Sequence, residues 1–273
     1  MFDFAKWKQD VLCGSPPTIY PCGFDNFHIG PKRVFLIGGA PGDGKTSLMM
    51  CAGFNALYLN TNLRLVACNI EMPAEDLWER ELARTSGVSL SKITDRTYRS
   101  SPDDVVKIKT AQERLEDVSS RITFVEPPFT LENVAKTVER HGGDIILLDY
   151  IQRITVRGET QDARSQNAEV MSMVRNFAHA GHALIVVAAI ARHANSSGKQ
   201  YVNTGIGSFR ESSELEYGAD ECYVFEHDPD RDAYTGTKTL KNVKNRKFKT
   251  QDVSLRFNGS LQQWSVSKEV DDV

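Results

Sequence analysis

The chain has 273 residues, of which 40% are hydrophobic, and its formal net charge at pH 7 is −3. This apolar content excludes a disordered protein, and the weak negative charge provides no overall basic field that would hold nucleic acid on a single subunit. No apolar run reaches the length of a membrane span, and the five cysteines without a C-x-x-C pair are typical of reduced thiols, so we expect a cytoplasmic protein with no membrane partner.

The first segment, residues 1–13, is a short amphipathic linker that precedes the domain proper. Its apolar residues stand among polar ones: Phe2, Phe4, Trp7, Val11 and Leu12. A helix this short is unstable alone in water, so its apolar side needs a surface to cover it. The chain's own domain and a neighbouring subunit are both open as that surface. Residues 14–273 contain no internal repeat and no further boundary, and we expect them to form one domain.

Residues 39–46 match the phosphate-binding loop pattern G-x-x-x-x-G-K-[ST] in full. An apolar run at 34–37 precedes the loop and a helix-like run at 47–52 follows it, as the motif requires. The glycines let several backbone N–H groups point at one phosphate chain, and the helix N-terminus adds its positive dipole end. Lys45 would reach the outer phosphates, and Thr46 would supply a hydroxyl to Mg²⁺. The motif predicts a nucleoside triphosphate site formed by Gly39, Ala40, Pro41, Gly42, Asp43, Gly44, Lys45, Thr46 and Ser47.

A carboxylate, Glu71, follows the next expected strand at residues 63–70. Pro73 can open the helix expected at 74–84, so Glu71 stands between a strand end and a helix start, where a side chain can face a nucleotide. On spacing alone, an ordinary exposed charge explains Glu71 equally well.

Strand and helix signals then alternate along the chain. Ser101 and Pro102 predict the start of a helix that runs to about residue 119. A strand at 121–125, a helix at 131–140 that ends at a glycine pair, and an apolar strand at 144–150 follow. Such alternation with fully apolar strands predicts a mostly parallel sheet covered on both faces.

Asp149 ends an apolar run of four residues, at the carboxyl end of its predicted strand. An aspartate in this place can hold Mg²⁺ through water while Thr46 holds it directly. A helix-capping aspartate is the alternative interpretation.

The last third of the chain combines one more buried strand with an antiparallel region. We expect a helix ending near residue 180, a strand at 183–190, and a functional role for the long polar segment 195–208. Turn signals such as Asn258-Gly259 predict hairpins among the closing strands, which are placed at 221–226, 239–243, 253–257 and 263–266.

Several short motifs follow one another in a specific order. They are Gly23-Phe24-Asp25, the phosphate-binding loop, Ile70-Glu71-Met72, Asp149-Tyr150-Ile151-Gln152, Phe209-Arg210-Glu211-Ser212 with Glu216 and Ala219-Asp220, and Lys244-Asn245-Arg246. From about residue 14 to 267, this order resembles the RecA-like motor domain of DnaB-type replicative helicases. The resemblance implies a RecA-like P-loop NTPase of the α/β class, with a mostly parallel central sheet flanked by helices and antiparallel strands at the C-terminal end.

The same resemblance implies an ATP and Mg²⁺ site shared between the subunits of a hexameric ring. Lys45, Thr46 and Asp149 would position the phosphates and Mg²⁺. Glu71 would orient or deprotonate the attacking water. These roles make the chain an ATP hydrolase.

Two cations near the end of the chain would complete the site of the next subunit. Lys244 and Arg246 would project onto its γ-phosphate, because cations must meet the charge on the transferring phosphoryl group. Their spacing of two puts both on one face of a strand. A basic, solvated edge strand is the alternative, since other lysines lie nearby.

In the family, single-stranded DNA threads the ring and is gripped at its phosphates. The matched positions here are Arg210, Glu211 and the backbone at Ser213, with the loops 152–161 and 192–208 lining the pore. Phosphate contacts carry no sequence information, so no base selectivity is expected. The resemblance thus implies an ATP-dependent 5′ to 3′ DNA helicase or single-stranded DNA translocase, with a loader or primase as a further partner.

The chain departs from the family pattern at three points. Ala189 stands where a glutamine usually senses the γ-phosphate, and Ser213 stands where glycine is common. No helical collar domain is recognised, so only residues 1–12 are candidates for a subunit-linking helix. These departures keep a second function open, namely a RecA-like ATPase that acts as a nucleotide-controlled scaffold or switch without unwinding.

Overall fold

The computed structural model describes residues 3–156, 163–190, 213–226 and 235–267. Within these ranges the strands form a nine-stranded sheet in the order β3-β2-β4-β5-β1-β6-β7-β8-β9. The strands are β1 (Arg33–Gly39), β2 (Leu65–Asn69), β3 (Ile122–Phe124), β4 (Ile145–Asp149), β5 (Ala183–Ala189), β6 (Glu221–Phe225), β7 (Thr235–Asn245), β8 (Val253–Asn258) and β9 (Gln263–Val266).

One side of the sheet is parallel and the other is antiparallel. The strands from β3 to β6 in this order run parallel to their neighbours, and β7, β8 and β9 are joined antiparallel. β7 is longer than the predicted strand at 239–243, because its polar ends pair with β6 and β8 although they lack an apolar run. The predicted fold class is confirmed.

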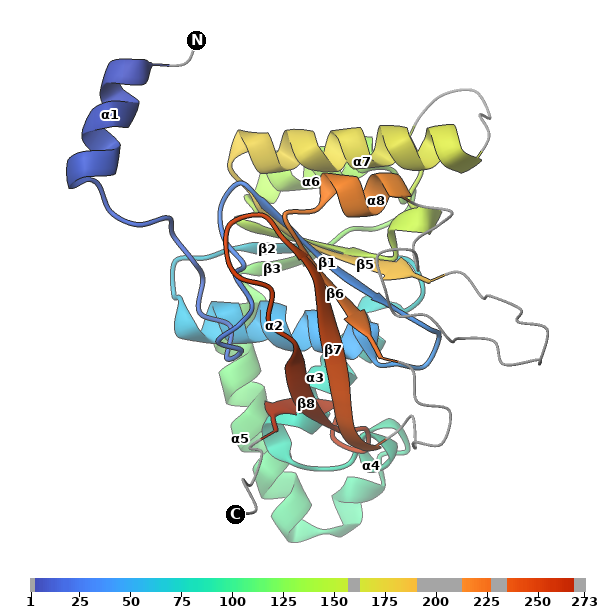
Figure 1. Ribbon diagram of the computed structural model, residues 1–273. Coiled ribbons are helices and arrows are strands. Elements are labelled where there is room, and N and C mark those ends of the chain that lie inside the picture. Colours follow the sequence, from blue (N-terminus) through green and yellow to red (C-terminus); the bar gives the residue numbers. More distant parts are fainter. Residues whose placement is uncertain (1–2, 157–162, 191–212, 227–234, 268–273) are drawn as a thin grey trace, which may run out of the picture.

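Helices cover both faces of the parallel strands (Figure 1). Successive residues of β1 point to opposite faces, so Phe35 and Ile37 join one core and Val34 and Leu36 join the other. The first core lies against α2, and the second lies beneath α6, α7 and α8. The helices are α2 (Lys45–Leu59), α3 (Ala74–Ser86), α4 (Leu90–Thr94), α5 (Pro102–Ser119), α6 (Leu131–His141), α7 (Ala163–Ala180) and α8 (Ser213–Gly218), with 3-10 turns η1 (Thr97–Ser100) and η2 (Ile151–Arg153).

Local signals placed helix boundaries correctly. The Ser101 hydroxyl accepts a hydrogen bond from the Asp104 N–H at 3.3 Å and caps α5, with Pro102 as its first residue. Gly142 ends α6 with a φ of 76°, a value that favours glycine. None of the described helices is long and apolar enough to cross a membrane.

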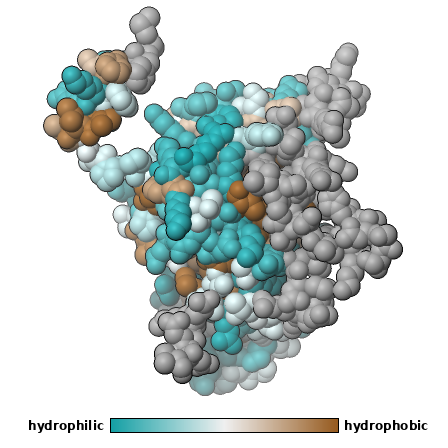
Figure 2. All heavy atoms as spheres, in the orientation of Figure 1, coloured by the Kyte–Doolittle hydropathy of each residue, from teal (hydrophilic) through white to brown (hydrophobic). Residues whose placement is uncertain are grey.

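The amino-terminal helix α1 (Phe4–Cys13) projects away from the sheet and its covering helices (Figure 1). No residue of α1 is buried: Phe4 is 63% exposed, Trp7 49% and Leu12 75%. Figure 2 shows the brown, apolar side chains of this helix facing open space. Of the two surfaces that the sequence left open to cover α1, the chain's own domain does not do so.

Candidate nucleotide site

The phosphate-binding loop lies at the carboxyl end of β1, and the helix α2 starts directly after it. Gly42 and Gly44 adopt φ values of 88° and 87°, which residues with a side chain rarely reach. Gly44 has a second reason to lack a side chain, because a Cβ atom there would lie 2.8 Å from the Trp264 ring. The predicted strand, loop and helix are confirmed.

An open pocket extends from this loop over the carboxyl ends of neighbouring strands. The structure brings Glu71 and Asp149 to the loop, as the sequence predicted, although both are distant from it along the chain. The pocket is lined by Pro41, Gly42, Gly44, Lys45, Thr46, Ser47, Glu71, Met72, Arg80, Asp149, Tyr150, Ala189, Phe257 and Gln262.

The other loop residues hold the shape of the loop. The Lys45 amino group donates to the Ala40 carbonyl at 2.7 Å, and the Ala40 N–H donates to the Asp43 carboxylate at 2.6 Å. Gly39 pairs with Ala189 across the β1–β5 ladder. Burial lowers the pKa of Lys45, and the nearby carboxylates, led by Asp43, oppose that shift. The lysine charge is therefore held inside the loop by oxygen atoms of the loop itself.

Asp149 is almost fully buried at the floor of the pocket, with 1% of its surface exposed. Its carboxylate accepts hydrogen bonds from the Thr46 hydroxyl and, at 3.0 Å, from the Asn69 amide. Burial raises the pKa of Asp149 to about 6, and the negative charge of Glu71 adds to the shift. A buried carboxylate beside a hydroxyl is a pair of hard oxygen ligands that suits Mg²⁺, and a cation there would relieve the cost of burying the charge.

Asn69 is a site residue that the sequence analysis missed. Its amide oxygen accepts the backbone N–H groups of Glu71 and Met72, at 3.0 and 2.9 Å, while its nitrogen reaches Asp149. It thus holds the turn that carries Glu71 against the strand that carries Asp149. A polar residue at the end of the apolar strand β2 was the available signal.

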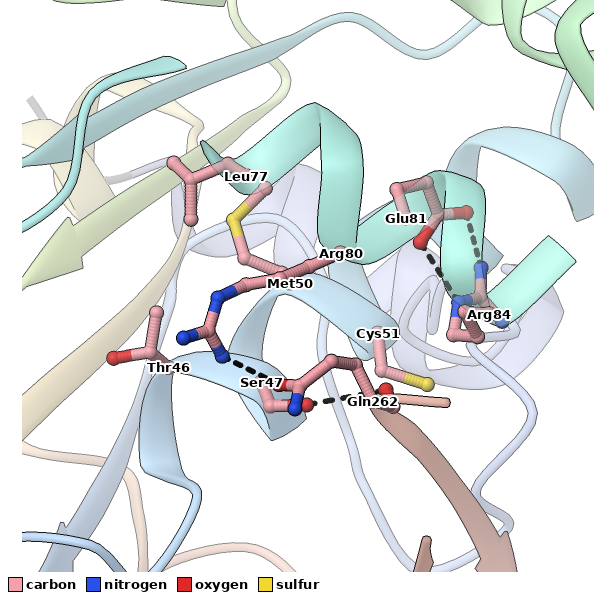
Figure 3. A pocket seen from close by; sticks show the side chains of 9 residues that line it. All are labelled: Thr46, Ser47, Met50, Cys51, Leu77, Arg80, Glu81, Arg84 and Gln262. Carbon is pink, nitrogen blue, oxygen red and sulfur yellow. Dashed lines mark hydrogen bonds and ion pairs between the residues drawn. The ribbon is translucent and has the colours of Figure 1, made fainter. Parts of the chain in front are cut away.

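Arg80 and Gln262 are two further pocket residues without a clear signal in the sequence. Arg80 reaches from α3 toward Thr46 and donates to the Gln262 side chain, while the Ser47 hydroxyl donates to the Gln262 carbonyl at 3.1 Å (Figure 3). Gln262 adopts a φ of 53° in the turn between β8 and β9. Arg80 is one of several charged residues on α3, and the sequence does not indicate what a turn residue such as Gln262 packs against.

Lys244 and Arg246 lie outside this pocket, at the other end of the sheet. Both donate to the Tyr217 carbonyl, Lys244 at 3.1 Å, so they do share one side of the strand end. Arg246 also lies 3.4 Å from the Asp220 carboxylate. Asp220 in turn binds the backbone of Val34 at the amino end of β1. Neither cation reaches the nucleotide pocket of its own chain.

The structure describes little of the positions that were predicted to contact DNA. Arg210 and Glu211 lie outside the described residues, as do most of the two predicted pore loops. Ser213 is described only as the first residue of α8, without its side chain.

Comparison with known proteins decides the family. The sequence model described as the DnaB-like helicase C terminal domain matches residues 24–266. The chain belongs to this family. Membership confirms the resemblance stated from the motifs and implies that the chain uses a nucleotide.

Curated relatives of this DnaB-like chain are longer than it is. A probable plasmid replicative DNA helicase from Chlamydia psittaci is 22% identical over 272 residues, which cover 97% of this chain and 58% of that protein. The replicative DNA helicase DnaB of Pasteurella multocida (strain Pm70) is 26% identical over 200 residues, or 70% of this chain and 41% of that protein. The chain thus spans about half the length of the curated relatives it matches.

Solved structures share the fold of this DnaB-like chain. One structure of an ATPase domain matches with a TM-score of 0.80 at 16% identity, covering 97% of this chain and 96% of that one. A DnaB-like replicative helicase, solved to study its interactions with primase, matches with a TM-score of 0.83 at 17% identity, covering 97% and 67%. The KaiC-like protein PH0186 from Pyrococcus horikoshii OT3 has a TM-score of 0.60 at 15% identity, with coverage of 93% and 100%. These likenesses support the RecA-like fold.

Proposed function

We propose that this chain is the motor of an ATP-dependent DNA helicase or single-stranded DNA translocase of the DnaB type, which hydrolyses ATP at the subunit interfaces of a hexameric ring. One observation carries the proposal. The pocket gathers Lys45, Glu71 and Asp149, whereas the cations Lys244 and Arg246 lie at the other end of the same sheet. A second subunit can supply to this pocket the cations that the chain cannot bring to it alone.

Each of these pocket residues would have a separate role in phosphoryl transfer. Lys45 would exchange the Ala40 carbonyl for phosphate oxygens, and the loop N–H groups would bind the rest of the phosphate chain. Thr46 and Asp149 would hold Mg²⁺, which neutralises charge on the phosphates when bound. Glu71 lines the pocket and remains exposed, so its carboxylate can orient or deprotonate an attacking water.

Contacts between subunits would supply the remaining parts. Lys244 and Arg246 would leave the Tyr217 carbonyl for the γ-phosphate bound by the next subunit. The uncovered apolar side of α1 would dock on a neighbouring copy, which supports the assignment of residues 1–13 as a subunit-linking segment before the motor domain at 14–273.

The proposed motor moves along single-stranded DNA in the cytoplasm. Arg210, Glu211 and the backbone at Ser213 would grip its phosphates independently of base sequence. A loader or a primase is the proposed protein partner, which fits the interaction with primase named for a DnaB-like helicase of the same fold.

One observation favours a scaffold or switch without unwinding as a second candidate. Ala189 presents only a methyl group to the pocket, so position 189 offers no side-chain amide to a phosphate. ATP could then bind with only a weak effect on the contacts between the protein and DNA.

Steady-state ATPase rates separate these functions. For the motor, the rate per subunit rises with protein concentration and with added single-stranded DNA, because the sites lie between subunits. A rate indifferent to DNA supports the scaffold instead.

Mixing two inactive variants tests the shared site directly. Lys45→Ala and Arg246→Ala are each expected to be inactive, and a mixture of both should recover part of the activity, since some interfaces then combine an intact loop with an intact Arg246. Lys249→Ala, a nearby exposed lysine, serves as the control and should behave like the wild type. Full activity of Arg246→Ala alone would contradict a shared site.

A further inference from the structure

A side-chain amide binds the end of β5 beside the nucleotide pocket. Gln152 lies in η2, directly after β4, and its nitrogen donates to the Ala189 carbonyl at 2.9 Å. The Ala189 N–H donates back to the Gln152 amide oxygen at 3.2 Å. Both backbone polar groups of one residue are therefore paired with one side chain.

This link begins where the backbone ladder between the two strands stops. The last β4–β5 pair is Leu148 with Val186, and Gln152 joins the strands again at Ala189. On its other side Ala189 pairs with Gly39, the first glycine of the phosphate-binding loop. Ala189 thus stands between the amide of Gln152 and the loop that would hold the phosphates.

Gln152 is well placed to keep this position. Ile151 and Ile154, on either side of it in the chain, are each 1% exposed and anchor the short helix in the core beneath α6 and α7. The next residue, Thr155, exchanges backbone hydrogen bonds with Phe129 and Leu131 at the start of α6. The amide is therefore carried by a segment that is itself fixed.

Both segments that leave this link lead to the loops assigned to DNA. The chain continues from Gln152 toward residues 157–161, and from Ala189 toward 191–212, which includes Arg210 and Glu211. Ala189 also lines the nucleotide pocket. One amide therefore joins two described residues that precede these segments, Gln152 and Ala189, at the pocket wall.

We propose that Gln152 is a positioning residue that couples the nucleotide pocket to the two following segments through the backbone of Ala189. It does not itself line the pocket. An amide suits this role because it offers a donor and an acceptor side by side, which match one peptide carbonyl and one peptide N–H. Water could pair with these backbone groups if the amide were removed, but water would not fix Ala189 relative to η2. The inference rests on the proposed function.

The first test compares Gln152→Leu with wild type and with Gln112→Leu, which removes an exposed amide from α5. We expect the ratio of the DNA-stimulated to the basal ATPase rate to fall about tenfold in Gln152→Leu, as the loss of two hydrogen bonds allows. Gln152→Glu keeps only the acceptor and should lose coupling as well. Gln112→Leu should match the wild type. Parallel loss of basal and stimulated rates, or unchanged stimulation, would overturn the inference.

A second readout needs no DNA and separates the inference from the proposed function. Trypsin cleavage within 191–212, which contains Arg192, Lys199 and Arg210, is followed with and without ATP and Mg²⁺. We expect the nucleotide to change the cleavage rate in the wild type and to leave it unchanged in Gln152→Leu. Equal nucleotide effects in both proteins, or none in either, contradict the coupling. A wild-type ATPase that ignores DNA, with intact nucleotide-dependent cleavage, instead removes the helicase function and leaves the coupling in place.

Discussion

The carboxyl and amino ends of the parallel strands differ in how far their charged side chains are buried. At the carboxyl end, Asp149 is buried beneath the phosphate-binding loop and paired with Thr46 and Asn69. At the amino end, the Arg246 side chain is 44% exposed and Lys244 and Arg246 share the Tyr217 carbonyl. Groups that act within their own chain can be buried in advance, whereas groups that act on another chain have to stay at the surface. In the proposed shared site, the carboxyl end would supply the phosphate-binding loop with Thr46 and Asp149, and the amino end would supply the cations.

Removing a cation at the amino end has the largest expected effect on catalysis that leaves nucleotide binding intact. Arg246→Ala should lower the ATPase kcat by about 10²–10³-fold, because charge on the transferring phosphoryl group is left unmatched. Nucleotide affinity of the single chain should stay unchanged, since Arg246 lies outside its own pocket. Equilibrium binding of a fluorescent ATP analogue and steady-state rates measure the two quantities. A loss of nucleotide affinity in isolated Arg246→Ala subunits would contradict the conclusion that Arg246 acts outside the pocket of its own chain.

The buried carboxylate at the other end predicts opposite effects on activity and on stability. Asp149→Asn should abolish hydrolysis, yet without nucleotide and with EDTA it should raise the free energy of unfolding at pH 7 by up to about 3 kcal/mol. The reason is that the pKa of Asp149 is raised to about 6 in the folded state. The folded protein then binds a proton that the unfolded chain has released, so wild-type stability falls as the pH rises from about 4 to about 6.

Urea unfolding between pH 4 and 8 checks this sign. The advantage of Asp149→Asn should shrink as the pH falls toward 4, because the folded wild-type carboxyl is then protonated and the unfolded one, with an ordinary pKa of 3.8, is about half protonated. Asp117→Asn, at a side chain that is 78% exposed, is the control and should show no such trend. A wild-type protein that gains stability over this pH range relative to Asp149→Asn would contradict the burial argument.

Substitutions at two glycines with similar φ angles compare the phosphate-binding loop with the turn that ends α3. Gly44→Ala combines a φ of 87° with a contact of 2.8 Å to Trp264, and should cost about 1–3 kcal/mol of stability as well as nucleotide binding. Gly87→Ala has a φ of 70° and open space around it, so it should cost only the backbone strain of about 1 kcal/mol and leave binding intact. Thermal unfolding and nucleotide titration of both variants measure the difference.

The smallest effect on the folded domain is expected at α1. Trp7→Ser should change the stability of the single chain by no more than about 0.5 kcal/mol, because the helix buries no residue. Its association into rings should weaken by about tenfold or more if the apolar side is an interface. Sedimentation velocity over a concentration series, with Lys8→Ser as the control on the same helix, tests this. Unchanged assembly would remove α1 from the interface.

Much of the fold could be predicted because its signals are local. The apolar runs that became β1, β4 and β5 need only their own residues to specify buried parallel strands, and the phosphate-binding loop is complete within residues 39–46. The carboxyl ends of parallel strands meet at one edge, so Asp149 could be expected at the loop before any contact was known, whereas spacing alone left Glu71 open and the family resemblance favoured it.

Other parts of the site depended on packing between distant segments. No local sequence pattern predicts that Arg80 on α3 donates a hydrogen bond to Gln262 in the β8–β9 turn, or that the Gln152 amide pairs with Ala189. These contacts follow from how the antiparallel strands and η2 lie against the parallel core, and that arrangement depends on the summed burial of many side chains. By itself, the sequence determined the sheet and the chemistry of the loop. Only the tertiary structure decided that Lys244 and Arg246 lie away from their own pocket, because the antiparallel pairing of β7 with β6 places the end of β7 at the opposite end of the sheet.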